Sequence, residues 1–264
     1  MTSTSACTGT GADHATEQAE APPWNAFDPE AYFEHYYGEP HQDDWELTYL
    51  AAKALKAVKA APGRTAVDII DVGTGPSLIP LLAALPVATH LTAWEYATPN
   101  IEWLAHELGS TALRPQWRHF WNAVRAAHDE EGHLPDDPLP LLRRRTSVSQ
   151  GSIYDLPRHA FDAATMYFCA ESITSRHDDF DRALGAFTAS VRPGGVVAAA
   201  FLAGSTGYHV SGRRFPAVPV DAGIISGLLR DRLDTFEICP IGLSPLEVRS
   251  GYCGALFLSG RTRS

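Results

Sequence analysis

The sequence has few cysteines, a deficit of basic residues and no long apolar run. Its four cysteines, Cys7, Cys169, Cys239 and Cys253, are scattered without a CxxC pair. This pattern argues against a disulfide framework or a metal site and fits a reducing, cytoplasmic setting. Lys and Arg number 21 against 31 Asp and Glu, which gives a formal net charge of -10. So acidic a chain is not expected to bind nucleic acid or an anionic membrane surface.

No apolar run approaches the length of a membrane span, and the N-terminus lacks the basic and apolar regions of a signal peptide. The 264 residues, 45% of them hydrophobic, suffice for one substantial core. Residues 1–23 are rich in Thr, Ala, Gly and Ser and are predicted to be a disordered tail. We expect one domain over residues 24–264, as a monomer or homodimer, with a helical lid over 24–62 and a core over 63–264.

The remaining sequence alternates between strand and helix patterns. Asp28 and Pro29 predict the start of a helix, and residues 44–60 repeat apolar residues at helical spacing. Strands are expected at 67–72, 90–94, 162–168 and 196–202, helices at 77–85, 99–108, 178–191 and 224–232, and an antiparallel pair at 236–241 and 253–258. Residues 114–146 are expected to form an irregular, partly helical insertion, and a loop should follow residue 202. This alternation predicts an α/β fold with a parallel sheet covered on both faces.

The strongest motif is the loop from Asp71 to Ser77, in which a buried strand runs into glycines and then a helix. Glycines allow a ligand to approach the backbone at the carboxyl edge of a sheet. The loop is neither GxGxxG nor followed by lysine, so a dinucleotide or phosphate loop is poorly matched. An acid before the first glycine favours a cationic or amino-acid-bearing ligand. An ordinary strand-to-helix turn is the alternative.

A second acid, Glu95, ends the next predicted strand about twenty residues later. This is the spacing at which a carboxylate accepts the hydroxyls of a ribose. Glu95 alone would be an ordinary surface charge, but beside the Asp71 loop the ribose role is the better interpretation. Two weaker signals follow: the strand ending at Phe168, and the turn Arg192-Pro193-Gly194-Gly195.

This order of motifs resembles the class I S-adenosylmethionine-dependent methyltransferases. It resembles more closely the nicotinamide, phenylethanolamine and thioether (indolethylamine) methyltransferases, because of the Tyr-rich segment from Phe27 to Tyr37. The resemblance runs from about Trp24 to the C-terminus. It implies a Rossmann-like fold with a mostly parallel seven-stranded sheet and an N-terminal helical lid, and S-adenosylmethionine as cofactor with S-adenosylhomocysteine as product.

The resemblance also implies roles for cofactor-binding residues. Tyr32 and Tyr37 would cover the cofactor, Glu95 would bind its ribose, and Tyr96 would border its adenine. Ser152 stands where the family has an Asp, which weakens the expected adenine contact there. The implied set is Tyr32, Tyr37, Asp71, Gly73, Thr74, Gly75, Ser77, Glu95, Tyr96, Asn100, Ser152, Ile153 and Tyr167.

On the substrate side the sequence departs further from the family. Methyltransferases of this family that act on amines and pyridines carry an acid at the end of the strand after the PGG turn, where this chain has Phe201. Plain strand packing of Phe201 is the alternative. The predicted pocket is aromatic and without an acid, and its expected wall is Tyr36, Phe168, Ser172, Phe201, Ser205, Tyr208 and Ala217.

These features leave three functions open. The first is methyl transfer to a nitrogen or sulfur of a small molecule, in secondary metabolism. The second is cyclisation of the cofactor itself, in which its own amine attacks its side chain and releases methylthioadenosine. The third is a cofactor-binding protein without activity. No catalytic residue is assigned; Tyr32, Tyr36 and Tyr208 are candidates, with Glu171 and His209 as weaker candidate bases.

Overall fold

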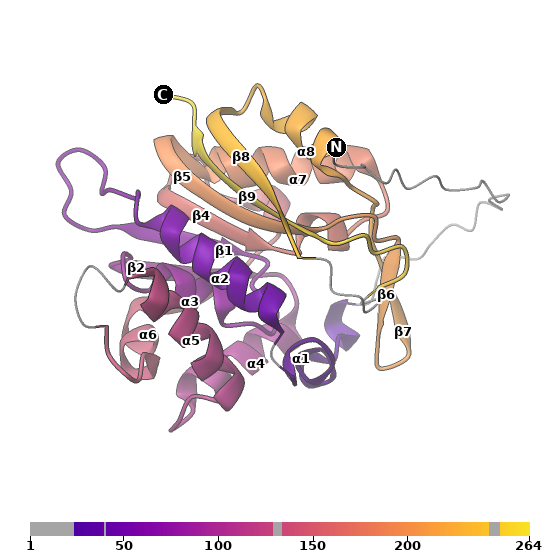
Figure 1. Ribbon diagram of the computed structural model, residues 1–264, viewed down its shortest axis with the longest axis horizontal. Helices are drawn as coiled ribbons and strands as arrows, with labels where there is room; N and C mark the ends of the chain where they lie inside the picture. The colour runs from indigo at the N-terminus through magenta and orange to yellow at the C-terminus, as the bar shows by residue number, and fades with distance from the viewer. Residues whose placement is uncertain (1–23, 40, 129–133, 243–248) are drawn as a thin grey trace, which may run out of the picture.

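The computed structural model describes residues 24–39, 41–128, 134–242 and 249–264 (Figure 1). The tail predicted over residues 1–23 lies outside this range. The helices are η1 Trp24–Ala26, α1 Pro29–Tyr37, α2 Gln42–Leu55, α3 Ile79–Ala84, α4 Thr98–Gly109, α5 Pro115–Ala127, α6 Leu139–Arg145, η2 Ile153–Asp155, η3 Ala170–Ser172, α7 His177–Ser190 and α8 Ala222–Leu229. The strands are β1 Asp68–Val72, β2 His90–Glu95, β3 Thr146–Gln150, β4 Phe161–Tyr167, β5 Val191–Leu202, β6 Gly207–Val210, β7 Arg213–Pro216, β8 Leu233–Ile241 and β9 Ala255–Thr262.

Seven strands form one sheet in the order β3-β2-β1-β4-β5-β9-β8. The first five run parallel, while β9 inserts antiparallel between β5 and β8. This arrangement confirms the predicted Rossmann-like fold and its closing antiparallel pair. The chain moves outward from β1 to β3 and then returns to β4, so a crevice opens between the carboxyl ends of β1 and β4.

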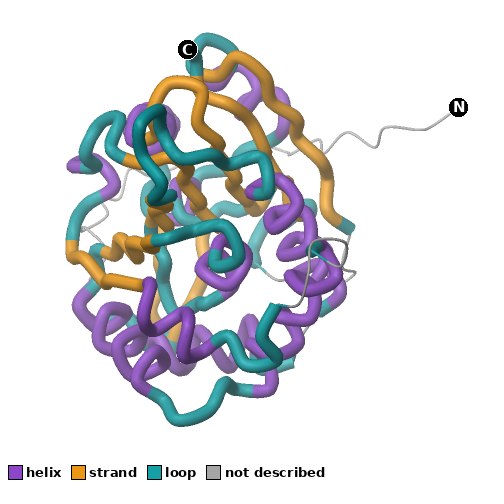
Figure 2. Tube along the Cα trace, turned by 90° about the vertical axis from the view of Figure 1, so that its left-hand side faces the viewer, coloured by secondary structure: helices purple, strands orange, loops and turns teal. Residues whose placement is uncertain are grey.

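Successive residues of the central strands face two separate cores. Ile69 of β1 packs with α2, α3, α4 and α5 on one face, whereas Ile70 packs with α7 and α8 on the other. The same alternation separates Ala198 from Ala199 in β5. The helices therefore cover both faces of the sheet. Figures 1 and 2 show this arrangement from two directions. Among the described residues, no helix combines the length and the apolar character needed to cross a membrane.

The N-terminal helix α1 begins where the sequence predicts. The Asp28 carboxylate accepts a hydrogen bond from the Ala31 amide at 3.0 Å, and Pro29 occupies the first turn. Its other oxygen accepts from the Ser211 hydroxyl at 2.7 Å, in the turn of the β6–β7 hairpin. Helix α1 is thus attached at its start to a hairpin 183 residues later in the chain.

A buried carboxylate holds α1 to the helices of the predicted insertion. Glu107 of α4 accepts from Arg114 Nε and from Trp117 Nε1, both at 2.8 Å. Arg114 also forms a salt bridge with Glu30 of α1 at 2.6 Å. Trp103 Nε1 donates to the other oxygen of Glu30 at 2.7 Å. This network fixes α1 as a lid at one edge of the sheet.

Some elements differ from the sequence prediction. Strand β3 was not expected, because Thr146–Gln150 is polar and lies at the sheet edge, where little apolar surface is buried. The expected loop after residue 202 contains the β6–β7 hairpin, with Ser211 (φ 47°) and Gly212 (φ 77°) at its turn. Residues 192–195, where a turn is expected, instead belong to β5. The pairing of β5 with β4 shifts register at this point. Helix α2 ends at Leu55, five residues short of its predicted end.

Candidate active site

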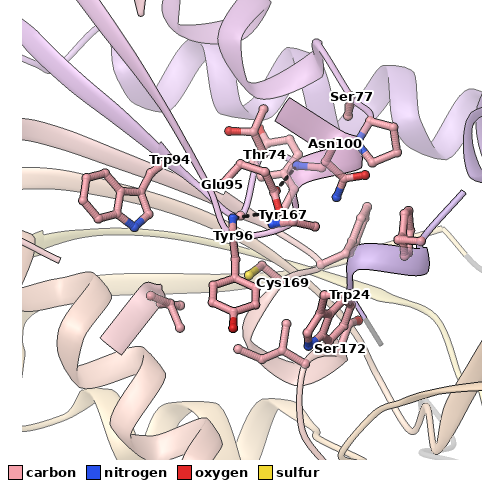
Figure 3. A pocket seen from close by; sticks show the side chains of 18 of the residues that line it. Trp24, Thr74, Ser77, Trp94, Glu95, Tyr96, Asn100, Tyr167, Cys169 and Ser172 are labelled. Atoms are coloured by element: carbon pink, nitrogen blue, oxygen red, sulfur yellow. Dashed lines mark hydrogen bonds between the residues drawn. The ribbon is translucent and has the colours of Figure 1, made fainter. Parts of the chain in front are cut away.

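A cavity of about 420 Å³ opens at the carboxyl ends of β1, β2 and β4, under the lid formed by η1 and α1 (Figure 3). One half is lined by the loop after β1, by the end of β2 and by the segment after β3. The other half is lined by aromatic side chains of η1, α1 and β6, with Ser172 and Arg249. The cavity therefore joins a polar cradle at the sheet edge to an aromatic chamber.

The glycine loop presents bare backbone to this cavity. Gly73 has φ +66°, and a Cβ added there would lie 2.2 Å from the Cys169 sulfur. Gly75 also has a positive φ, of 58°. Both conformations favour glycine, and at Gly73 the side chain of any other residue would in addition clash with Cys169. Thr74 and Ser77 line the cavity beside them, as predicted from the motif.

The acid that precedes the loop lies beneath it. Asp71 is 1% exposed and does not line the cavity; its carboxylate accepts from the Thr165 hydroxyl at 2.7 Å. Burial raises the pKa of Asp71 to about 7. This buried position of Asp71 differs from the prediction that its side chain contacts the cofactor directly. Asp71 shapes the loop from below, where its own carbonyl accepts from the Thr74 hydroxyl at 3.2 Å.

Glu95, at the end of β2, is held by three backbone amides. One carboxylate oxygen accepts from Gly75 N, and the other accepts from the amides of Tyr96 and Ala97, each at 2.8 Å (Figure 3). Burial raises the pKa of Glu95, while these amide hydrogen bonds oppose the shift. The carboxylate is thus fixed in one orientation on the cavity wall, and it ties the glycine loop to β2.

The rest of the predicted cofactor set, apart from Asp71, lines the same cavity as Glu95. Tyr96 is 56% exposed at the cavity rim, and Asn100 of α4 is buried with its Oδ1 unpartnered among the described residues. Ser152 uses its hydroxyl to accept from the Tyr154 amide at 3.2 Å, so it caps η2. The predicted residues that line the cavity are Tyr32, Tyr37, Gly73, Thr74, Gly75, Ser77, Glu95, Tyr96, Asn100, Ser152, Ile153 and Tyr167.

The structure divides the predicted substrate wall. Phe168, Ser172 and Tyr208 line the main cavity. Phe168 has φ +53°, a conformation that non-glycine residues rarely adopt and that is found at functional sites. Tyr36 instead lines an adjacent cavity of about 90 Å³, which shares Phe168 and Arg249 with the first.

Three predicted wall residues lie elsewhere. Phe201 is fully buried in the core beneath α7, with its ring 6.0 Å from that of Phe180. The prediction that it lines the substrate pocket is therefore not supported, because β5 directs this side chain to the opposite face of the sheet from the lid helices. Ser205 and Ala217 are buried and do not line the cavity either.

Neither candidate base reaches the main cavity. His209 is exposed on β6. Glu171 is fully buried and accepts from the Leu202 amide at 3.0 Å, and burial raises its pKa to about 7. The lining of the aromatic chamber instead includes Tyr32 and Tyr208. Burial raises the pKa of Tyr32 to about 12 and that of Tyr208 well above its usual value, so both remain phenols at neutral pH.

Arg249 is the charged lining residue of the cavity that the sequence prediction missed. It is 4% exposed and lines both cavities. Its guanidinium donates to Ser172 Oγ at 2.8 Å, Tyr32 OH at 3.1 Å and Tyr36 OH at 3.3 Å. It also lies over the Tyr208 ring, 4.0 Å from the centroid. No local motif marks Arg249, because its contacts with Tyr32 and Tyr36 of α1 form only in the folded chain.

Four aromatic lining residues, Trp24, Phe27, Trp94 and Tyr154, were also not predicted as site residues. Trp24 packs on Phe215 of the hairpin with ring centroids 5.2 Å apart, and Phe27 packs on the same ring at 5.1 Å. Trp94 alternates with buried residues of β2, and its indole Nε1 donates to the Ser152 carbonyl at 3.1 Å. Sequence patterns predict that such aromatic residues pack in the core. Only the folded structure shows that they line the cavity.

Comparison with known proteins gives a consistent result. The model of the NNMT/PNMT/TEMT family matches residues 16–239. Human phenylethanolamine N-methyltransferase is 27% identical over 237 residues, which cover 80% of this chain and 79% of that protein. Human nicotinamide N-methyltransferase is 22% identical over 226 residues, covering 80% and 83%. The N-methyltransferase NodS from Bradyrhizobium japonicum, solved with S-adenosyl-l-homocysteine, has a TM-score of 0.52 at 9% identity, covers 89% of this chain and 97% of that one, and so shares the fold.

Proposed function

Because the chain belongs to the NNMT/PNMT/TEMT family of S-adenosylmethionine-dependent methyltransferases, we propose that it transfers a methyl group to a nitrogen atom of a small molecule. The names of its human relatives, phenylethanolamine and nicotinamide N-methyltransferase, support nitrogen as the acceptor atom. A sulfur acceptor and a role in secondary metabolism remain predictions of the sequence.

The observation that carries the proposal is the continuity of the cavity. Its polar cradle and its aromatic chamber meet beneath the tyrosines of α1, so that two ligands can lie in contact. Two buried polar atoms on its lining residues, Asn100 Oδ1 and Tyr167 OH, have no partner among the described residues. Buried polar groups without partners are costly, and a polar ligand in the cradle would satisfy them. The residues present therefore fit a nucleoside with an amino-acid side chain.

We assign the cofactor-binding roles as follows. Glu95, already oriented by three amides, accepts the ribose hydroxyls. Tyr96 and Ile153 flank the adenine, with Ser152 beside it. Thr74, Ser77, Asn100, Tyr37 and Tyr167 surround the amino-acid part, and Gly73 and Gly75 allow it to approach the backbone.

The cofactor supplies a methyl group on a cationic sulfonium, which a nucleophile displaces in line. The protein positions the two reactants and excludes water, roles that we assign to the lid and its aromatic rings. Tyr32 and Tyr208 line the chamber with aromatic faces and hydroxyls, and Tyr36 lines the smaller cavity that adjoins it. Their π faces favour a cationic centre. A neutral amine or ring nitrogen needs no general base, which agrees with tyrosines that remain phenols.

The direct test is incubation of the purified chain with S-adenosylmethionine and a panel of amines, N-heterocycles, thioethers and phenols, followed by mass spectrometry. We expect an acceptor heavier by one methyl group, together with an equal amount of S-adenosylhomocysteine. Methylthioadenosine formed without any acceptor would instead indicate cyclisation of the cofactor and would overturn the proposal. So would methylation of sulfur or oxygen acceptors alone.

A further inference from the structure

The chamber contains a buried positive charge that methyl transfer does not by itself require. Arg249 is 4% exposed, and the three hydrogen-bond partners of its guanidinium are the hydroxyls of Tyr32, Tyr36 and Ser172. All three are uncharged. Among the residues that the structure describes, no carboxylate forms a salt bridge with it. Glu171 attracts it electrostatically from outside salt-bridge range.

A buried guanidinium whose hydrogen-bond partners are all uncharged can bind an anion. A buried charge is costly unless it is paired, and arginine has five N–H donors, of which three are used here. The remaining donors belong to the two terminal nitrogens, the pair that binds a carboxylate in bidentate fashion. The Tyr208 ring, 4.0 Å from the guanidinium carbon, holds the plane of the group in place.

The position of Arg249 favours the acceptor over the cofactor as the source of the anion. Its partner Ser172 lies at the lower right in Figure 3, whereas Ser77 and Asn100 of the cofactor cradle lie at the upper right. Of its other contacts, Tyr208 lines the aromatic chamber and Tyr36 lines the smaller cavity beside it. The guanidinium thus faces the ligand that would occupy the chamber.

We propose that Arg249 binds a carboxylate of the methyl acceptor, so that the substrate is a small aromatic or heterocyclic nitrogen compound with a carboxylate group. This inference rests on the proposed function and specifies the substrate class of the same site. Phenylethanolamine and nicotinamide, named for the human relatives, carry no carboxylate. The aromatic rings receive the ring of the acceptor, and Arg249 with Ser172 orients it by its anionic end.

The test compares matched ligands that differ in charge alone at one position. Nicotinate is paired with nicotinamide, anthranilate with 2-aminobenzamide, and phenylserine with phenylserinamide. Each is titrated by calorimetry into the protein saturated with S-adenosylhomocysteine, so that no turnover is needed. Arg249→Gln and Arg249→Lys are compared with Arg213→Gln, which changes an exposed arginine of β7. S-adenosylhomocysteine and methylthioadenosine, which lacks the amino-acid carboxylate, are titrated separately into each variant.

For the wild type, we expect at least one carboxylate ligand to bind at least about tenfold more tightly than its neutral partner. Arg249→Gln should abolish this preference, Arg249→Lys should keep part of it, and Arg213→Gln should leave it unchanged. S-adenosylhomocysteine should bind Arg249→Gln within about threefold of the wild type. If Arg249→Gln does not fold, the wild-type preference and the lysine variant decide the question.

Two results would overturn the inference while the proposed function stands. One is wild-type protein that binds S-adenosylhomocysteine but prefers the neutral member of every pair. The other is an Arg249→Gln variant that loses affinity for S-adenosylhomocysteine but not for methylthioadenosine, which would assign the guanidinium to the carboxylate of the cofactor. Failure of the wild type to bind S-adenosylhomocysteine at all would instead contradict the proposed function.

Discussion

Glu95→Gln should weaken cofactor binding through the glycine loop as well as through the ribose. In the wild type, one carboxylate oxygen accepts from Gly75 N and the other accepts from two amides, all at 2.8 Å. The amide of glutamine has one oxygen and one NH₂ group. If the oxygen keeps the amides of Tyr96 and Ala97, the NH₂ group faces the Gly75 N–H, and two donors oppose each other. The loop must then move away from the cradle.

The magnitude follows from the number of hydrogen bonds lost. A hydrogen bond to a charged group contributes about 1.5–3 kcal/mol, and an opposed pair of donors forfeits at least one such bond. A loss of about 2 kcal/mol corresponds to a dissociation constant about 30-fold higher for S-adenosylhomocysteine. Ribose hydroxyls that donate to a neutral amide oxygen rather than to a carboxylate add to this loss.

Calorimetric titration measures the effect, with Glu102→Gln on the exposed face of α4 as the matched control. To separate the ribose contact from the loop, the titration is repeated with methylthioadenosine and its 2′,3′-dideoxy analogue. The wild type should prefer the ribose form, and Glu95→Gln should lose most of that preference. A Glu95→Gln protein that binds S-adenosylhomocysteine within about threefold of the wild type would refute the reasoning.

Three further predictions concern stability, measured by urea unfolding without ligand. Gly73→Ala should cost about 2–4 kcal/mol, because its Cβ would lie 2.2 Å from the Cys169 sulfur at a φ of +66°, and Cys169→Gly should recover part of the loss. Glu107→Gln should cost about 1–3 kcal/mol, because it removes the charge that pairs with the partly buried Arg114; an unchanged midpoint would contradict this. Burial raises the pKa of Asp71 to about 7, so between about pH 4 and pH 7 the folded chain holds a proton that the unfolded chain has lost. The free energy of unfolding should therefore fall as pH rises through this range, by up to about 1.4 kcal/mol per pH unit. Asp71→Asn should reduce this slope.

The sheet edge could be predicted from the sequence because its signals are local. The loop at Gly73 and the acid Glu95 each follow directly from a buried strand, and parallel strands bring their carboxyl ends together. The same reasoning places Asn100 in the first turn of the helix after β2. Strand β3 was missed because it is short and polar, so its pairing with β2 depends on backbone hydrogen bonds rather than on an apolar pattern.

The aromatic chamber could not be predicted in the same way, because segments far apart in the chain build it. Tyr32 and Arg249 are separated by 217 residues. The β6–β7 hairpin reaches α1 through a hydrogen bond between Ser211 and Asp28. No periodicity within a window of ten or twenty residues encodes such contacts. The prediction for Phe201 was wrong for a related reason: family position alone does not fix the face of the strand on which a side chain lies.

The charge of the chamber is therefore the property that the structure changes most. The sequence predicts a pocket without an acid, which leaves it neutral and aromatic. The structure adds Arg249, so the pocket is cationic before any ligand binds, and a cationic sulfonium must enter the same cavity. Two positive charges in one buried space repel, and a carboxylate on the acceptor would relieve that repulsion. Binding of the acceptor and of S-adenosylmethionine should then be cooperative, and the cooperativity should be weaker with S-adenosylhomocysteine, which lacks the sulfonium charge. Equal coupling for the two cofactor forms, measured on an acceptor carboxylate, would contradict this electrostatic account.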